Sequence, residues 1–185
     1  MNCWKTINFN KEFGMNRLYL QSFLIGLLAF ILLYIPFSVK HGTADLYESG
    51  IIPLILAIFF MPIMHTSMHI LPLIMLNKRA RLIFKRNTLF FPIVNYYTKK
   101  HLTKKASLLA AGAPTLLITI PGIMGAWLFS EYYVYFLIFT SVHMAMTFTD
   151  FLYILYISKA PKRSYIENSN NEITILVNSD NKSAG

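Results

Sequence analysis

Residues 51–76 read IIPLILAIFFMPIMHTSMHILPLIML, and this stretch decides the fold class. It contains no Lys, Arg, Asp or Glu. At ~1.5 Å per residue, a helix of this length spans more than the ~30 Å of hydrocarbon in a bilayer. We therefore expect a transmembrane helix here, and it carries two histidines, His65 and His69.

Three further apolar stretches are long enough to cross a bilayer: residues 18–39, 106–130 and 132–158. Only Glu131 separates the last two, which predicts a tight helical hairpin. The whole chain is 55% apolar and 14% charged, against roughly 25% charged in soluble domains. These features predict an all-α, multi-pass protein of the cell membrane, with one integral domain (1–160) and a polar tail (161–185).

The N-terminal region does not have the pattern of a cleaved signal peptide. Rather polar residues precede the first apolar run, and this run ends without a small-residue cleavage site. We therefore expect residues 18–39 to remain as the first span. The single cysteine, Cys3, excludes an internal disulfide framework and a cysteine-based metal cluster.

The distribution of Lys and Arg predicts the orientation in the membrane. The formal net charge is +9, and nine basic residues fall in the loop 77–105. These nine are Lys78, Arg79, Arg81, Lys85, Arg86, Lys99, Lys100, Lys104 and Lys105. Because basic loops stay inside, we expect this loop and both termini to be cytoplasmic. The basic residues alternate with membrane spans, so the expected partner is anionic lipid rather than nucleic acid.

Two shorter segments outside the spans have a distinct pattern. Residues 88–97 (TLFFPIVNYY) are apolar but too short to cross as a helix. They predict an interfacial element or a short hairpin, and Pro92 argues against a central strand. Residues 173–177 form a short β-prone run in the tail.

Ionisable residues inside spans are energetically expensive, so each is a candidate functional residue. His65 and His69 lie at positions i and i+4, which places both imidazoles on one helix face. This spacing suits two nitrogen ligands of one metal ion. Hydrogen bonding between helices is the structural alternative.

The depth of these residues in the bilayer links them to a carboxylate. From the cytoplasmic ends of their spans, His69 lies roughly 10 Å deep, Asp150 roughly 12 Å and His65 roughly 16 Å. Two imidazoles and one carboxylate would make a three-ligand zinc site with an open position. A metal-free His–Asp cluster is the alternative. His143, deeper by roughly 10 Å, suits packing, support of a ligand, or an alternative ligand.

Three segments resemble the DUF3267 family: HTSMHILPL, AGAPTLLI and DFLYILYISKAPKRSYIEN. The resemblance covers nearly the whole chain, and its start resembles the Bacillus branch of the family. Members are bacterial membrane proteins described as zincin peptidases, related in layout to site-2 intramembrane metalloproteases. The resemblance implies that His65 and His69 match the histidines of an HExxH motif. It also implies that Asp150 matches the carboxylate ligand, and that the metal is zinc.

The chain departs from this motif at one position, where Thr66 replaces Glu. The resemblance implies that this Glu is the general base, which takes a proton from the attacking water. A threonine hydroxyl does not accept that proton near neutral pH, and loss of a general base typically costs ~10²–10⁴-fold. We therefore expect a zinc site with weak or absent peptidase activity, acting on a membrane protein if at all.

The alternative function is a metal-free membrane scaffold or regulator that binds partner helices or anionic lipid. A transporter is less favoured because four spans without a repeat give little architecture for alternating access. The sequence does not identify a substrate or an oligomeric state.

Overall fold

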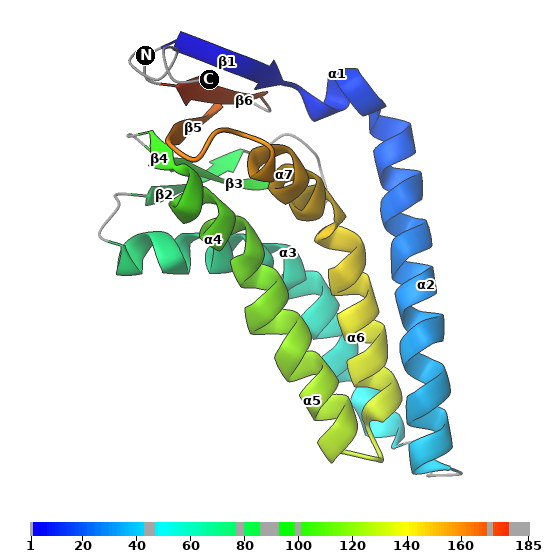
Figure 1. Ribbon diagram of the computed structural model, residues 1–185. Helices are drawn as coiled ribbons and strands as arrows, with labels where there is room; N and C mark the ends of the chain where they lie inside the picture. The colour runs from blue at the N-terminus through cyan, green and yellow to red at the C-terminus, as the bar shows by residue number, and fades with distance from the viewer. Residues whose placement is uncertain are drawn as a thin grey trace.

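The protein is a bundle of long helices with a small β-sheet at one end (Figure 1). The computed structural model describes residues 2–42, 47–76, 80–85, 93–98, 101–169 and 172–177. The helical part consists of α1 (Phe9–Phe13), α2 (Met15–His41), a 3₁₀ turn (Glu48–Gly50), α3 (Ile51–Met75), α4 (Lys104–Pro114), a π-helical turn (Thr115–Thr119), α5 (Ile120–Leu128), α6 (Tyr133–Met146) and α7 (Phe148–Ser158).

Three of the helical stretches are long and apolar enough to cross a membrane individually. They are Met15–His41, Glu48–Met75 and Lys104–Leu128. The fourth predicted span is present as two helices, α6 and α7, which meet at a bend of 44°. Three of the four predicted apolar stretches are therefore long helices of spanning length, and the fourth is a pair of helices with a bend between them. The tight hairpin at Glu131 is confirmed, because α5 ends at Leu128 and α6 begins at Tyr133.

The strands form two antiparallel sheets beside α4 and α7 (Figure 1). The larger sheet has the order β1-β6-β5-β4, and β2 pairs with β3. The strands are β1 (Asn2–Ile7), β2 (Ala80–Lys85), β3 (Ile93–Thr98), β4 (Leu102–Thr103), β5 (Ser164–Ser169) and β6 (Glu172–Val177). The β-prone run 173–177 lies in β6, and residues 93–97 of the expected hairpin lie in β3. Residues 88–92 lie outside the described residues.

Two strands correct the expectation of an all-α fold. The rather polar residues before the first span were not expected to form a strand, whereas residues 2–7 form an edge strand on β6. No strand was expected between the last span and residue 173, whereas β5 pairs there with both β6 and β4. The beginning and the end of the chain therefore fold together.

The outer faces of the helices carry large apolar side chains. On α2 these include Leu20, Phe23, Leu32 and Ile35, each more than half exposed. Contiguous exposed apolar surface of this extent suits contact with lipid. This exposure agrees with the long apolar spans in indicating a membrane protein.

Close approach of helix backbones brings the spans together. A Cβ atom at Gly26 of α2 would lie 2.8 Å from Ala145 Cβ on α6. A Cβ atom at Gly122 of α5 would overlap the hydroxyl of Thr140, also on α6. Small residues at such crossings are typical of membrane bundles, which gain contact by backbone proximity. Helix α6 is therefore held on two sides.

Helix α7 is fixed by the sheet above it. Ile7, Ile166 and Ile175 form one buried cluster with Tyr153 and Ile157 of α7. At the end of α7, the Lys104 ammonium donates to the carbonyls of Ser158 and Ala160. A cation at a helix C-terminus satisfies carbonyls that lack an intrahelical donor. The start of α7, which carries Asp150, is thus held in a defined position.

Candidate metal centre

The two histidines of α3 point into the interior of the bundle. The side chains of His65 and His69 are only 10% and 8% exposed. Their Nε2 atoms lie 3.3 Å apart. Both imidazoles thus share one helix face, as the i, i+4 spacing predicts.

Asp150 joins this pair from α7. Its Oδ2 lies 3.1 Å from His65 Nε2, and its Oδ1 lies 3.6 Å from His69 Nε2. One ligand atom from each of the three residues fits within a cluster no wider than 4.8 Å. The expectation that Asp150 lies at the level of the histidine pair is therefore confirmed as a juxtaposition.

The bend between α6 and α7 positions Asp150. Thr147 lies at the junction, and its hydroxyl donates to the carbonyl of Met144. Asp150 then falls in the first turn of α7. A carboxylate at a helix N-terminus is stabilised by the positive end of the helix dipole. The bend thus lets α7 present a carboxylate toward α3 instead of continuing in line with α6.

Each histidine has a second partner on the far side of its ring. His69 Nδ1 lies 2.9 Å from the carbonyl oxygen of Ala110. Because a carbonyl only accepts, Nδ1 donates, and in the neutral ring Nε2 carries the lone pair. His65 Nδ1 lies 3.2 Å from His143 Nε2, and His143 Nδ1 lies 3.0 Å from the Thr119 hydroxyl. These contacts orient both rings with Nε2 toward Asp150.

His143 therefore has a defined place. Of the three roles open from the sequence, its geometry corresponds to the support of a candidate ligand, because its contact is with the outer nitrogen of His65. Sequence reasoning missed Thr119, whose only signal is a hydroxyl within an apolar run, and the carbonyl of Ala110, which has no sequence signal.

Thr66 is buried beside the histidines on α3. Its hydroxyl donates to the carbonyl of Pro62 at 2.9 Å, one turn earlier. A hydroxyl in this geometry bonds its own helix backbone. It offers no carboxylate that could accept a proton.

The donor set fits zinc in number, chemistry and spacing. In a tetrahedral site with bonds of ~2.0–2.1 Å, ligand atoms lie about 3.3 Å apart. The two Nε2 atoms lie 3.3 Å apart, His65 Nε2 lies 3.1 Å from Asp150 Oδ2, and His69 Nε2 lies 3.6 Å from the other carboxylate oxygen, Oδ1. Asp150 Oδ2 is also a buried atom without a well-formed hydrogen bond among the described residues, although His65 Nε2 is close. A carboxylate oxygen left in this way is available to a cation.

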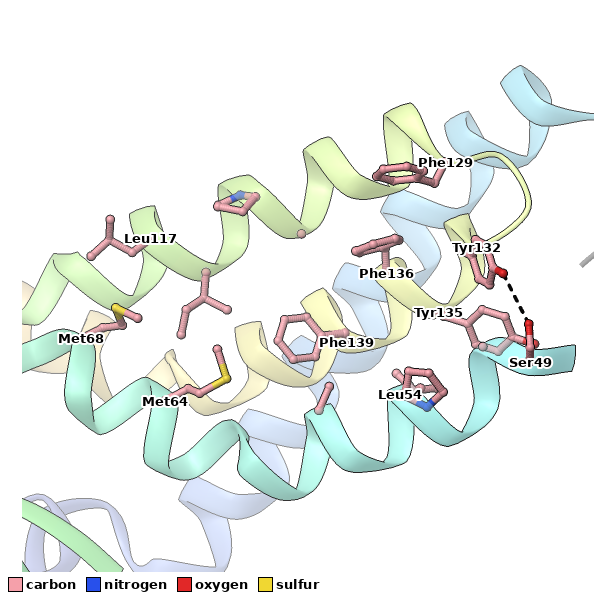
Figure 2. Close-up of a pocket in the computed structure, with 16 residues that line it drawn as sticks. Ser49, Leu54, Met64, Met68, Leu117, Phe129, Tyr132, Tyr135, Phe136 and Phe139 are labelled. Carbon is pink, nitrogen blue, oxygen red and sulfur yellow. Dashed lines mark hydrogen bonds between the residues drawn. The ribbon is translucent and has the colours of Figure 1, made fainter. Parts of the chain in front are cut away.

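An apolar groove of about 650 Å³ runs between α3, α5 and α6 (Figure 2). Met64 and Met68 line one end, and Ser49 and Tyr132 lie at the other. The two methionines directly precede His65 and His69, so the groove follows the neighbouring face of α3. The three clustered polar residues do not line it.

The comparisons with known proteins agree with the geometry of the cluster. No curated protein and no solved structure matches the chain. The model of the DUF3267 family, described as "Putative zincin peptidase", matches residues 58–165. This segment contains both histidines of α3, Asp150 and His143. Because the match covers more than half of the chain, the protein belongs to the DUF3267 family.

Proposed function

We propose that the protein is a zinc-binding membrane protein laid out like the site-2 intramembrane metalloproteases, with weak or no peptidase activity. The observation that carries this proposal is the convergence of His65, His69 and Asp150 from two helices far apart in the sequence. The family supports the same chemistry, since zincins are zinc peptidases. In this proposal the three side chains are the protein ligands of one zinc ion.

The balance of hydrogen-bond donors and acceptors supports a bound cation. His69 presents the lone pair of Nε2, because its Nδ1 donates to Ala110. Asp150 adds two acceptor oxygens. Among the described residues, His65 Nε2 lies 3.1 Å from one of them, close enough to donate, and His69 Nε2 lies 3.6 Å from the other. A buried cluster with more acceptors than donors is costly in an apolar surrounding. A divalent cation would remove this cost.

Bound zinc would act as a Lewis acid on a water or a carbonyl oxygen. The residues of the chain then have distinct tasks. His65, His69 and Asp150 hold the ion, and the apolar helices around them exclude bulk water. Thr66 occupies the position of the general base without supplying one.

The proposed setting is the cell membrane, with both termini and the loop 77–105 on the cytoplasmic side. The proposed class of substrate or binding partner is an apolar segment of another membrane protein. Its support is the groove beside the histidine pair, which flexible methionines line at one end.

Elemental analysis of protein purified in mild detergent tests the metal directly. We expect about one zinc ion per chain and its loss in His65→Ala and His69→Ala. The matched control is His101→Ala, which removes an exposed histidine near Glu167 and leaves the cluster intact. A folded wild-type protein that holds no zinc would refute the proposal.

The missing base has its own test. Thr66→Glu should create or raise peptidase activity, because it adds a proton acceptor beside the site. Thr66→Gln is the control of equal size without a carboxylate, so it separates proton transfer from steric effects. The probe is a set of apolar single-span peptides in detergent, with products identified by mass spectrometry. Equal activity in both variants, with zinc retained, would show that more than the base is missing.

The rival function is a metal-free scaffold. It draws support from the short distance between His65 and Asp150, which suits a direct His–Asp contact. In that case His65→Ala leaves function intact, while charge reversal at Lys105 reduces binding to vesicles that contain anionic phosphatidylglycerol.

A further inference from the structure

His143 bridges a candidate ligand and a hydroxyl in the centre of the bundle. It is completely buried on α6. Its Nε2 faces His65 Nδ1 on α3, and its Nδ1 faces the Thr119 hydroxyl at the end of the π-helical turn. Both ring nitrogens thus have one partner each. A neutral imidazole has one donor nitrogen and one acceptor nitrogen. The two hydrogen bonds that link His65, His143 and Thr119 must therefore both be donated in the same direction along this row.

The two histidines of α3 differ in how their tautomers are fixed. The carbonyl of Ala110 only accepts, so it holds His69 with the proton on Nδ1 whether or not a metal is present. His65 has a partner that donates or accepts, because the nitrogen it faces belongs to an imidazole. His65 can therefore carry its proton on either ring nitrogen, depending on whether a metal ion is bound.

We propose that His143 and Thr119 are positioning residues for His65, and that zinc binding reverses the direction of the hydrogen bonds in this row. This inference rests on the proposed function. In the zinc-bound form His65 Nε2 must offer a lone pair, so Nδ1 carries the proton and donates to His143 Nε2. His143 Nδ1 then donates to the Thr119 hydroxyl.

The metal-free form has the opposite direction. His65 Nε2 lies beside the Asp150 carboxylate and the lone pair of His69, so its proton sits on Nε2. Its Nδ1 then accepts from His143 Nε2, and His143 Nδ1 accepts from the Thr119 hydroxyl.

The protons balance between the two forms. When zinc binds, the proton of His65 Nε2 leaves to solvent, and the proton on His143 Nε2 moves to His65 Nδ1. One solvent proton is taken up at His143 Nδ1. Thr119 keeps its proton and turns from donor to acceptor, and both rings stay neutral.

The hydroxyl of Thr119 is the group that permits both directions, since a hydroxyl donates and accepts. The π-helical turn Thr115–Thr119 contributes to its placement, because a wider turn rotates the side chains that follow it. The close contact of Gly122 with Thr140 then holds this part of the helix against α6. Such turns are frequent at functional sites.

Two pairs of variants test the role of the row in zinc affinity. Thr119→Val keeps the shape but leaves His143 Nδ1 without a partner, whereas Thr119→Ser restores a hydroxyl. His143→Leu removes the partner of His65 Nδ1, whereas His143→Gln supplies an amide that accepts. Loss of a group that orients a ligand typically weakens metal binding roughly 10–100-fold. We expect this weakening for Val and Leu, and near wild-type zinc affinity for Ser and Gln.

The reversal has a spectroscopic readout that a purely structural role would not move. In protein labelled with ¹⁵N-histidine, the NMR shifts of His143 report which ring nitrogen carries the proton. We expect the proton on Nε2 with a chelator present and on Nδ1 with zinc, measured on the full chain in detergent. An unchanged tautomer in a chain that binds zinc overturns this inference alone. A folded chain that binds no zinc overturns the proposed function as well.

Discussion

Replacing the candidate carboxylate ligand by its neutral isostere, Asp150→Asn, should separate metal binding from folding. In the metal-free protein the new amide fits the observed geometry. Its oxygen at the Oδ2 position accepts from His65 Nε2 across 3.1 Å, and its NH₂ at the Oδ1 position faces the lone pair of His69 Nε2 at 3.6 Å. A buried charge is costly unless it is paired and hydrogen-bonded, and a neutral amide in its place removes that cost. We therefore expect an equal or higher melting temperature without metal.

With zinc present, the wild-type protein should have the higher melting temperature of the two. A ligand present at 100 times its Kd stabilises the folded state by about 2.7 kcal/mol. For a chain of this size 1 kcal/mol corresponds to about 2–4 °C, so zinc should raise the wild-type Tm by about 5–10 °C. Asp150→Asn should lose most of this shift, because an amide oxygen is a weaker zinc ligand than a carboxylate.

The assay for this variant is thermal unfolding in detergent, followed by tryptophan fluorescence, with zinc or with a chelator. The control is Glu131→Gln, which neutralises an exposed carboxylate in the turn between α5 and α6 and should keep the full zinc shift. A full zinc shift in Asp150→Asn would refute the assignment of Asp150 as a ligand. A clear loss of metal-free stability would refute the argument from its hydrogen bonds.

Two further predictions concern orientation and packing. By the positive-inside rule, exposed Cys3 should react with a membrane-impermeant maleimide only after the cells are permeabilised. A cysteine at position 49 (Ser49→Cys in a Cys3→Ser background) should react in intact cells. The reverse labelling would overturn the predicted orientation. Gly122→Ala should lower thermal stability by about 1–3 kcal/mol through overlap with Thr140. Gly112→Ala should leave thermal stability unchanged, because a Cβ atom at Gly112 meets no atom within 4 Å. Equal losses of stability in the two variants would contradict the close contact of α5 with α6.

The spans could be predicted from the sequence because a bilayer imposes a minimum length of apolar residues. The sheet could not, because its pairing depends on distant partners. In β1 the segment NCWKTI has neither strong alternation nor length, and it becomes a strand by pairing with β6 from the far end of the chain. The bend at Thr147 was also missed, since no proline or glycine marks it.

The core of the candidate site was predictable because ionisable groups in a membrane are rare and expensive. His65, His69 and Asp150 stand out in apolar runs, and their depths along parallel spans bring them to one level. Their supporting groups were not predictable. Ala110 contributes through its backbone, and Thr119 reaches His143 only because a π-helical turn precedes it.

The geometry of α3 makes holding a metal and accepting a proton separable tasks. The outer nitrogens of His65 and His69 are fixed by groups on other helices, α6 and α4. Neither contact involves residue 66, whose hydroxyl donates to its own helix at Pro62. A change at residue 66 therefore leaves the orientation of both imidazoles supported. On the proposed function, this independence would let the chain keep its candidate ligands with Thr66 at the position of the general base. It also makes Thr66→Glu a test of catalysis that leaves both imidazoles in place.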